Sequence, residues 1–408
     1  MPHDPFLALR NRDYRAFAAG SLASSTALQM LSLALAWEVY ARTHDAMQLG
    51  YLGLARATPV LLLALPAGHA ADLYDRRRML AITQALFAVF CAALALASQA
   101  EASLWVLYLL VALTGVTRSM HGPSRNSLLP LLVTEQELHN SLTWSSGVFQ
   151  LSAIGGPLLG GALIGITGKA WPAYATSAVL CVIAAATSLR LRPRKIVRTS
   201  NERYTIKGIT KGAGHLWREK TVLAALALDL FAVLLGGATA LMPLYAEILG
   251  VGPIGLGALK AAPYIGAFLM AIVLAYRRPS NRNGQALLLS VAGFGLATIG
   301  FGVSTSFWLS LVLLALLGGL DNISVVIRSV LVQVRTPDEL RGRVSAVNSL
   351  FIEASNELGA YESGLVASWF GPVVSVVSGG VGTLVVVAGI ALAWPELRRL
   401  GRLVPLDE

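Results

Sequence analysis

The chain has 408 residues, of which 55% are hydrophobic and only 13% are charged, and its mean hydropathy is +0.64. A soluble globular domain carries roughly 25% charged residues, so this composition excludes an ordinary soluble protein. A bilayer-spanning helix needs roughly 20 mostly apolar residues, and a chain of this length accommodates about twelve of them with short loops. We therefore expect an all-α membrane protein.

In chain order, the apolar runs predict twelve spans. Residues 1–15 are polar and show no cleavage site before the first apolar run, so we expect no signal peptide. The predicted spans cover residues 16–42, 48–71, 79–98, 103–120, 141–166, 172–191, 221–247, 253–276, 285–304, 307–333, 344–370 and 372–394.

The net charge of +10 invites a nucleic-acid interpretation, but the positions of the cations argue against such a partner. Nearly all of the 32 Lys and Arg residues fall in the N-terminus, in every second loop and in the C-terminal tail. The other side of the membrane receives only Arg42 and Lys169, while Arg56, Lys260 and Arg328 lie within spans. By the positive-inside rule, the cation-rich side is cytoplasmic. We expect both termini there.

The sequence offers no pattern for enzymatic chemistry. Cys91 and Cys181 lie inside predicted spans without metal-ligand spacing, so we interpret them as small buried side chains. Neither a nucleophile–base constellation nor a phosphate-binding loop is recognisable, and no nucleotide-binding domain drives transport by ATP. We expect no enzyme activity, metal or cofactor.

The longest polar stretch, residues 192–220, divides six spans from six and holds many of the cytoplasmic cations. We interpret it as a linker whose basic face lies on anionic lipid headgroups. The expected organisation is an N-terminal six-helix bundle over 1–191, the linker, a C-terminal six-helix bundle over 221–394 and a cytoplasmic tail over 395–408.

An internal repeat indicates that the two halves are related. Arg56 in span 2 and Lys260 in span 8 each stand three residues before a proline, half the chain apart. Residues 134–138 and 336–340, before spans 5 and 11, both read as T-x-x-E capping boxes. Both similarities fall on the same membrane side, which predicts a parallel repeat about an axis along the membrane normal. Chance similarity of short capping motifs is the alternative.

The loop between spans 2 and 3 carries Gly68, Asp72, Asp75, Arg76 and Arg77. This segment resembles the G-x-x-x-D-x-x-G-R-R/K motif of the major facilitator superfamily, although Asp75 stands where Gly is usual and Leu stands at position 73 where Arg is usual. The resemblance implies a loop that latches the cytoplasmic gate in one conformation. A plain positive-inside anchor explains the arginines equally well, but it does not explain Gly68 and Asp72.

Span 5 contains Gly156, Pro157, Gly160 and Gly161, which resemble the G-P-x-x-G-G motif of the antiporter branch of this superfamily. The small residues permit close helix contact, and Pro157 releases a backbone hydrogen bond, so the helix can bend. The resemblance implies a hinge that favours exchange over leak. Ordinary close packing of a membrane helix is the alternative interpretation.

The loop before span 11 carries Thr336, Glu339, Arg341, Gly342 and Arg343. With the segment that follows, it resembles the enterobactin-exporter-like and macrolide-efflux-like group of major facilitators. The resemblance covers nearly the whole chain. It implies the major facilitator fold, with twelve transmembrane helices in two pseudo-symmetric six-helix bundles, as a monomer in a bacterial-type inner membrane.

Ionisable side chains inside spans cost roughly 2.5–3.5 kcal/mol each on insertion scales, so each should face a cavity or a partner. Glu353 and Glu357 share one helix face at about 5–6 Å, where two carboxylates resist double ionisation and one is expected to hold a proton near neutral pH. The residues predicted to bind protons or substrate are Asp229, Asp321, Glu353, Glu357 and Asn356.

Four further charges are expected in the cavity: Arg56, Lys260, Arg328 and Glu362. Arg328 stands close enough to the cytoplasm to snorkel, and Glu362 is expected to serve a helix contact. Static ion pairs of Arg56 with Glu38 and of Lys260 with Glu247 are the alternative. The matched cations in spans 2 and 8 hint at an anionic or zwitterionic ligand.

These features predict an alternating-access transporter that binds its substrate between the halves near the bilayer midplane. The function expected first is proton-coupled efflux, by antiport, of a small amphiphilic molecule such as a drug or siderophore. Its partners would be that small molecule, protons and membrane lipid. The alternatives are a lipid or lysolipid transporter, an uptake carrier without proton antiport, and a non-transporting membrane receptor.

Overall fold

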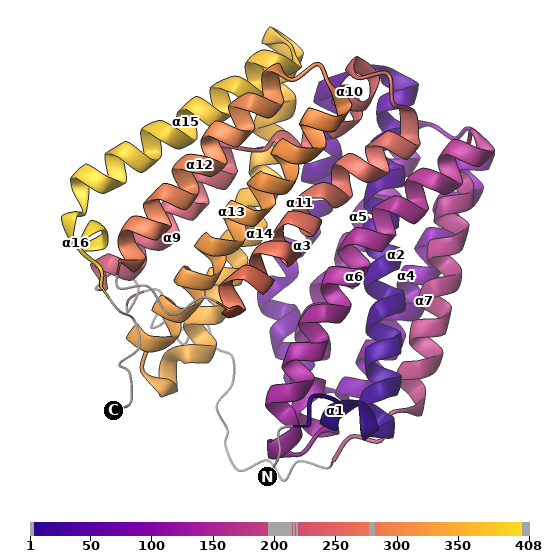
Figure 1. Ribbon diagram of the computed structural model, residues 1–408. Coiled ribbons are helices and arrows are strands. Elements are labelled where there is room, and N and C mark those ends of the chain that lie inside the picture. Colours follow the sequence, from indigo (N-terminus) through magenta and orange to yellow (C-terminus); the bar gives the residue numbers. More distant parts are fainter. Residues whose placement is uncertain (1–3, 195–213, 215–216, 218, 277–281, 402–408) are drawn as a thin grey trace. The chain divides into compact units, whose positions relative to one another are not determined.

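The computed structural model describes residues 4–194, 214, 217, 219–276 and 282–401, apart from the side chains at 64–65, 68–73, 238, 338–339, 341–343, 346 and 350. Every regular element in this part of the chain is a helix (Figure 1). Eleven of the described helices are long and apolar enough to cross a membrane. The helix α14 (Asp338–Phe370) is long enough to be the twelfth, and it differs in carrying Glu353, Glu357 and Glu362.

The chain divides into two compact units. Unit 1 comprises Met1–Val39 and Ala55–Tyr204, and unit 2 comprises Tyr40–Leu54 and Thr205–Glu408. Unit 2 thus includes the end of the first long helix and the start of the second. Most of the predicted linker, 192–220, lies outside the described residues, so the predicted domain bounds stay a prediction.

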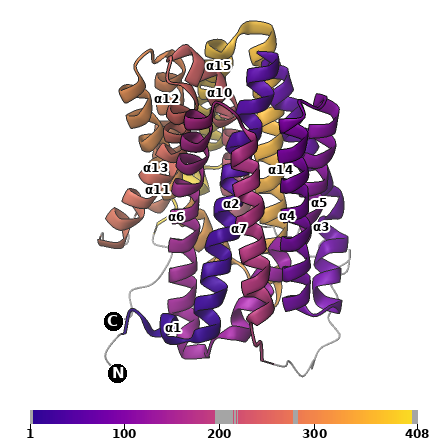
Figure 2. The ribbon, with the colours of Figure 1, turned by 90° about the vertical axis from the view of Figure 1, so that its right-hand side faces the viewer.

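Unit 1 is built from long helices whose axes are roughly aligned with one another (Figures 1 and 2). The elements are α1 (Leu7–Arg10), α2 (Arg12–Thr43), α3 (Ala46–Leu73), α4 (Arg76–Gln99), α5 (Leu104–Leu132), α6 (Glu135–Thr167) and α7 (Trp171–Arg190). The capping box predicted at Thr134 is confirmed, since the Thr134 side chain accepts from the Glu137 N–H and Glu137 accepts from the Thr134 N–H at 2.8 Å. Gly168 ends α6 in the left-handed conformation that glycine adopts without strain.

Unit 2 contains α9 (Lys220–Leu235), the 3₁₀ helix η1 (Ala238–Leu241), α10 (Met242–Ile248), α11 (Gly252–Tyr276), α12 (Asn283–Val303), α13 (Phe307–Arg335), α14, α15 (Pro372–Ala393) and α16 (Pro395–Arg398). The predicted span over 221–247 corresponds to the candidate span Lys220–Ile248, but it is not one continuous helix, because it breaks at Gly236 and Gly237. A Cβ at Gly237 would lie 2.7 Å from the Gly359 carbonyl oxygen of α14. Only glycine permits this approach, and the break falls where the two backbones meet.

The internal repeat reappears in the packing of each unit. In unit 1, Gly115 of α5 packs against α3, where an added Cβ would lie 2.8 Å from the Arg56 carbonyl oxygen and 3.3 Å from Pro59. In unit 2, Gly318 of α13 packs against the Pro263 carbonyl of α11 at the matching place. In each unit, the proline-containing second span therefore contacts a glycine of the fourth long span. This shared packing supports two related halves.

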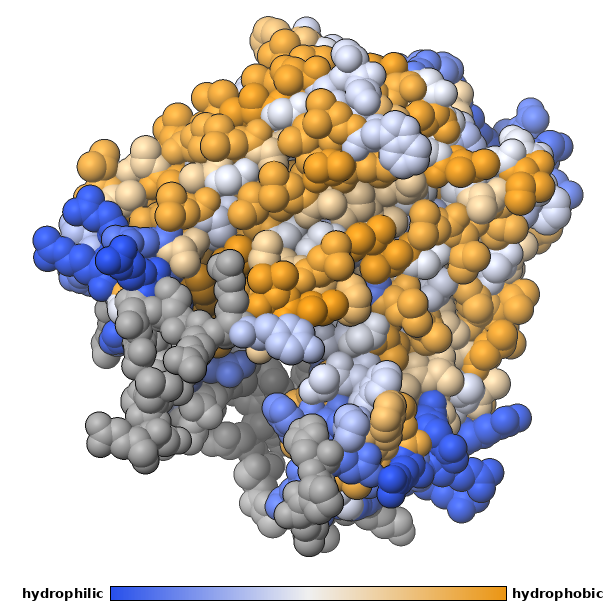
Figure 3. Space-filling view, viewed as in Figure 1, coloured by the Kyte–Doolittle hydropathy of each residue, from blue (hydrophilic) through white to orange (hydrophobic). Residues whose placement is uncertain are grey.

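Apolar side chains cover the lengths of the helices. Figure 3 shows hydrophobic residues over α11, α12 and α13, with hydrophilic residues gathered near α1 and α16. Large side chains such as Trp105, Leu289 and Leu392 are more than two-thirds exposed. Contiguous exposed apolar surface on this scale is expected where lipid replaces water around the helices.

Candidate functional site

An ion pair between Asp229 of α9 and Arg328 of α13 lies in the interior of unit 2. Asp229 is 7% exposed and Arg328 is 6% exposed, and the Arg328 Nε also donates to the Ser324 carbonyl oxygen at 3.4 Å. The expectation that Arg328 snorkels to the cytoplasm is therefore wrong. Its guanidinium stays inside because the opposite charge of Asp229 and a backbone acceptor stabilise it there.

Asp321 stands about two turns before Arg328 on α13, so the two side chains share one face of the helix. It is close enough to both Asp229 and Arg328 for their charges to act on it. Ser324 lies between them on this face, and its buried hydroxyl has no hydrogen-bond partner among the described residues. The structure thus brings together two predicted carboxylates, one predicted cation and the Ser324 hydroxyl.

The acidic residues of α14 differ in their environments. Glu357 is buried, and its Oε2 would lie 3.5 Å from a Cβ added to Gly53 of α3, so the missing side chain of Gly53 leaves room for the carboxylate. Glu353 is half-buried one turn away. Asn356 is exposed and donates to the Ile352 carbonyl of its own helix at 2.8 Å. Glu362 is half-buried and lies 3.5 Å from the Ser363 hydroxyl.

Three of the four side chains considered for static ion pairs, Arg56, Glu38 and Glu247, form hydrogen bonds with uncharged side chains. Arg56 donates to the Ser32 hydroxyl at 3.0 Å, and Tyr174 donates to buried Glu38 at 2.6 Å, both within unit 1. Lys260 is half-buried in α11 of unit 2. Glu247 of α10 accepts from the Tyr40 hydroxyl.

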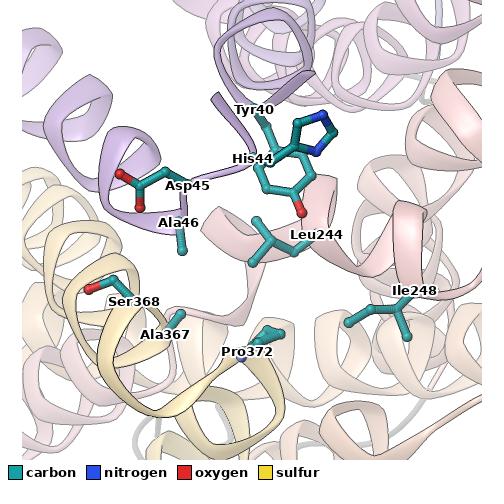
Figure 4. A pocket seen from close by; sticks show the side chains of 9 residues that line it. All are labelled: Tyr40, His44, Asp45, Ala46, Leu244, Ile248, Ala367, Ser368 and Pro372. Atoms are coloured by element: carbon teal, nitrogen blue, oxygen red, sulfur yellow. The ribbon is translucent and has the colours of Figure 1, made fainter. Parts of the chain in front are cut away.

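A cavity of about 480 Å³ lies beside Tyr40 in unit 2. Figure 4 shows its lining, with Tyr40, His44, Asp45 and Ala46 from the turn between α2 and α3, Leu244 and Ile248 from α10, and Ala367, Ser368 and Pro372 from the turn between α14 and α15. The His44 Nδ1 lies 3.6 Å from the Glu247 carboxylate, but both side chains are more than half exposed. An exposed pair of this kind contributes about 0–1 kcal/mol, so the cavity is bordered by a weak polar contact.

The loop that resembles the gating motif is fixed in unit 1 by two hydrogen bonds. Asp75 caps α4, because its carboxylate accepts from the Arg78 N–H at 2.9 Å. Arg76 donates to the Ser127 carbonyl of α5 at 3.0 Å. Arg77 is half-buried, whereas Gly68 and Asp72 have side-chain positions outside the described residues. Asp75 therefore replaces the usual glycine with a residue that begins the helix.

The glycines of α6 that resemble the antiporter motif face α2. A Cβ added to Gly156 would lie 2.6 Å from the Gln29 Cβ and 2.9 Å from the Thr26 carbonyl oxygen. At Gly160 it would lie 2.9 Å from the Met30 side chain, while Pro157 and Gly161 are buried beside them. These contacts show close helix packing. The implied hinge stays a prediction.

The capping box predicted before the eleventh span is wrong. The helix α14 begins at Asp338 with Pro337 as its N-cap, and no side chain caps it. Thr336 is buried, and its hydroxyl has no hydrogen-bond partner among the described residues. In a capping box, the side chain at the third helical position accepts from the backbone N–H of the N-cap residue. Pro337 has no backbone N–H, so the box cannot form at this N-cap. The other residues predicted there, Glu339, Arg341, Gly342 and Arg343, have side chains outside the described set.

Three basic side chains of α5 were missed as membrane-embedded residues. The fourth span was predicted to end at 120, but α5 continues to Leu132 through Pro123 and Pro130. His121 and Arg125 therefore lie on a helix rather than in a cytoplasmic loop, and Arg118, although inside the predicted span, was counted with the cations of that loop. Their spacing of three and four residues was the available signal, since it places basic side chains on one helix face.

The sequence matches the profile of the Major Facilitator Superfamily over residues 17–360. The chain belongs to this superfamily. The enterobactin exporters EntS of Shigella dysenteriae serotype 1 (strain Sd197) and Escherichia coli O1:K1 / APEC are each 25% identical to it over 393 residues, which cover 96% of this chain and 94% of each relative. The expected resemblance is thereby confirmed for the family.

Solved transporter structures share the fold at lower identity. A bacterial homologue of the human lysosomal transporter Spinster, in an inward-facing and occupied conformation, superposes with a TM-score of 0.75 at 14% identity, covering 97% of this chain and 99% of that one. The POT family transporter PepTSo gives 0.73 at 11% identity, with 95% and 98% covered. This major facilitator protein is a multi-pass membrane transporter with the predicted all-α fold.

Proposed function

We propose that this transporter carries out proton-coupled efflux, by antiport, of a small amphiphilic molecule such as a siderophore. The observation that carries the proposal is the Asp229–Arg328 ion pair inside unit 2, with Asp321 on the same face of α13. The similarity to enterobactin exporters over nearly the whole chain supports efflux of a siderophore-like compound.

A buried ion pair with a second carboxylate beside it is suited to proton exchange. Protonation of Asp229 removes the charge that holds Arg328, and the guanidinium can then turn to Asp321. With Asp321 ionised throughout, the first arrangement has both carboxylates charged, and the second has a proton on Asp229 and pairs Arg328 with Asp321. The two arrangements then differ by one bound proton. Exchange of that proton for substrate couples the two fluxes, with Glu353 and Glu357 of α14 as further carboxylates in the pathway.

The proposed antiport, together with the direction of the proton gradient, gives the direction of transport. We place both termini in the cytoplasm of a bacterial inner membrane, because nearly all basic residues outside the spans then face inward. The inward proton gradient of such a membrane drives outward movement of the substrate. The protein would act as a monomer.

Reconstitution tests this proposal. Proteoliposomes with a trapped pH-sensitive dye receive a proton gradient and a panel of siderophores, macrolides and lipophilic cations. We expect substrate-dependent proton movement for the wild type and its loss in Asp229→Asn and Glu357→Gln. The matched control is Glu135→Gln, which changes an exposed carboxylate at the start of α6.

Two variants are used because Asp229→Asn could misfold, since it leaves Arg328 with a neutral neighbour. Glu357→Gln does not change the Asp229–Arg328 pair. Transport of a labelled substrate without proton movement, at the same rate in both variants, contradicts the proposal. Lipid or lysolipid movement would then be assayed with the same vesicles.

A further inference from the structure

Two cysteines of unit 1 lie opposite each other where α4 packs against α7. Consecutive spans cross a membrane in alternate directions, so α4 and α7, with α5 and α6 between them in the chain, run antiparallel. The Ser188 hydroxyl of α7 donates to the Gln84 Oε1 of α4 at 2.7 Å, which fixes the register of the two helices. Cys91 follows Gln84 by about two turns and Cys181 precedes Ser188 by about two turns, so each stays on the helix face of this bond. The two cysteines are therefore level across the interface.

The surroundings of these two side chains are closely packed and apolar. Cys91 is 0% exposed and Cys181 is 1% exposed. Within the described helices, no residue of α4 after Arg78 and none of α7 before Arg190 carries a charge. Small residues let helix backbones approach closely, so that side chains at one level meet. Small buried residues flank the cysteines on the same two faces: Ala88, Ala95, Ser177 and Ala184.

The two thiols share one space between the helices. Their sulfur atoms are close enough for a charge on one to act on the other. Both cysteines are free, and neither thiol forms a hydrogen bond with any part of the described chain. The structure thus holds two buried, unpaired thiols side by side. Sequence spacing gave no sign of this arrangement, because the two residues lie on different helices.

The chemistry of two buried thiols selects the kind of ion that they can bind. Thiolates are soft ligands and bind soft metal ions. With two ligands, the ion must be stable in a linear two-coordinate geometry, as Cu(I), Ag(I) and Hg(II) are. Two thiolates leave a net negative charge with a monovalent ion and none with a divalent ion, and an uncompensated charge is costly in an apolar interior. Zinc is divalent but takes four ligands. Mercuric ion meets both requirements.

We propose that Cys91 and Cys181 together bind one soft divalent ion in linear geometry, and that mercuric ion is the ion that fits. Mercuric chloride is uncharged and can enter from lipid. Each sulfur displaces one chloride, so that two S–H and two Hg–Cl bonds break, two Hg–S bonds form and two HCl leave, without a change of oxidation state. The bridge joins α4 to α7 inside unit 1. This site is independent of the proposed proton antiport, which uses residues of unit 2.

Stoichiometry tests the site directly, because the chain has 2 cysteines. The purified full chain in phosphatidylcholine nanodiscs is treated with mercuric chloride, and the remaining thiols and the bound mercury are counted by alkylation and intact-mass measurement. We expect one mercuric ion per chain, with both thiols consumed and a higher unfolding temperature, because the ion joins two helices. Methylmercury chloride is the control reagent. It accepts one thiolate, so it should consume one thiol per ion without raising the unfolding temperature.

Variants show whether both sulfur atoms hold the ion. Cys91→Ser and Cys181→Ser should each lose bound mercuric ion to a glutathione wash roughly tenfold faster than the wild type, or more, because a two-point attachment is lost only when both bonds open. Ser188→Ala is the matched control. It changes the same interface and keeps both thiols, so it should retain the ion as the wild type does.

Three outcomes with the wild-type chain overturn the proposal. Two mercuric ions per chain would show that the thiols bind separately. Uptake by the denatured chain but not by the native chain would show that the ion does not reach the site. Loss of both thiols with a mass change of two hydrogens and no mercury would show that a disulfide forms instead. These outcomes hold even if a cysteine variant fails to fold, and none of them bears on proton-coupled efflux.

Discussion

The two units of this transporter share their helix packing but differ in the charges that their helices carry. In unit 1, the acidic and basic side chains described away from the helix ends are all basic: Arg56, Arg118, His121 and Arg125. In unit 2, where Asp229 lies inside the candidate span Lys220–Ile248, carboxylates predominate: Asp229, Asp321, Glu353, Glu357 and Glu362, beside Lys260 and Arg328. Small residues thus preserve the repeat, while the polar residues on the same framework have diverged. This difference points to separate tasks for the two halves.

The largest effect is expected in unit 2, from removing the charge of Arg328. Arg328→Met leaves Asp229 buried without its cation, and loss of one partner of a buried pair costs about 3–5 kcal/mol. We expect a large drop in the unfolding temperature, measured by the tryptophan fluorescence of the detergent-solubilised protein. The double variant Asp229→Leu with Arg328→Met should recover most of the stability. A double variant as unstable as the single one would show that the pair is not the source of the loss.

Two buried tyrosines sharpen the comparison between the units. Tyr174 donates to the Glu38 carboxylate of unit 1 at 2.6 Å, whereas Tyr245 donates to the neutral Gly302 carbonyl of unit 2 at 2.9 Å. Hydrogen bonds to charged groups contribute about 1.5–3 kcal/mol and neutral ones about 0.5–1.5 kcal/mol. Tyr174→Phe should therefore destabilise more than Tyr245→Phe in the same unfolding assay. The reverse order would mean that Glu38 is not held as a carboxylate by this bond.

The close helix packing of unit 1 is tested at two adjacent glycines of α6. Gly156→Ala places a methyl group against Gln29 and Thr26 of α2 and should cost about 1–3 kcal/mol. Gly155→Ala is the matched control, because no atom lies within 4 Å of its added Cβ. Equal unfolding temperatures for the two variants would contradict the close contact of α2 and α6.

The smallest effect is expected at the N-cap of α4. Asp75→Ala removes the bond to the Arg78 N–H and should cost about 1 kcal/mol, whereas Asp75→Gly should cost only a few tenths. The difference is measurable as a shift in the unfolding temperature of the two purified variants. If alanine and glycine are equivalent there, Asp75 has a role other than capping.

Much of the fold could be predicted from hydropathy, because a span must satisfy its backbone hydrogen bonds by forming a helix. The break at Gly236 and Gly237 could not, since it depends on how closely α14 approaches them. The pairing of Asp229 with Arg328 could not be predicted either, because the two residues lie on different helices, although each was expected in a site. Arg125 was assigned to a loop because the fourth span was predicted to end at 120, whereas α5 continues to Leu132.

The most direct test of proton exchange in unit 2 compares Asp229→Asn with the exposed-carboxylate control Glu135→Gln in the same vesicles. Uptake of a labelled substrate from the panel and proton flux are recorded together over a range of substrate concentrations. The account predicts that Glu135→Gln keeps the wild-type ratio of protons to substrate. It predicts that Asp229→Asn lowers that ratio. If Asp229→Asn transports the substrate with the wild-type ratio, Asp229 does not exchange the coupled proton.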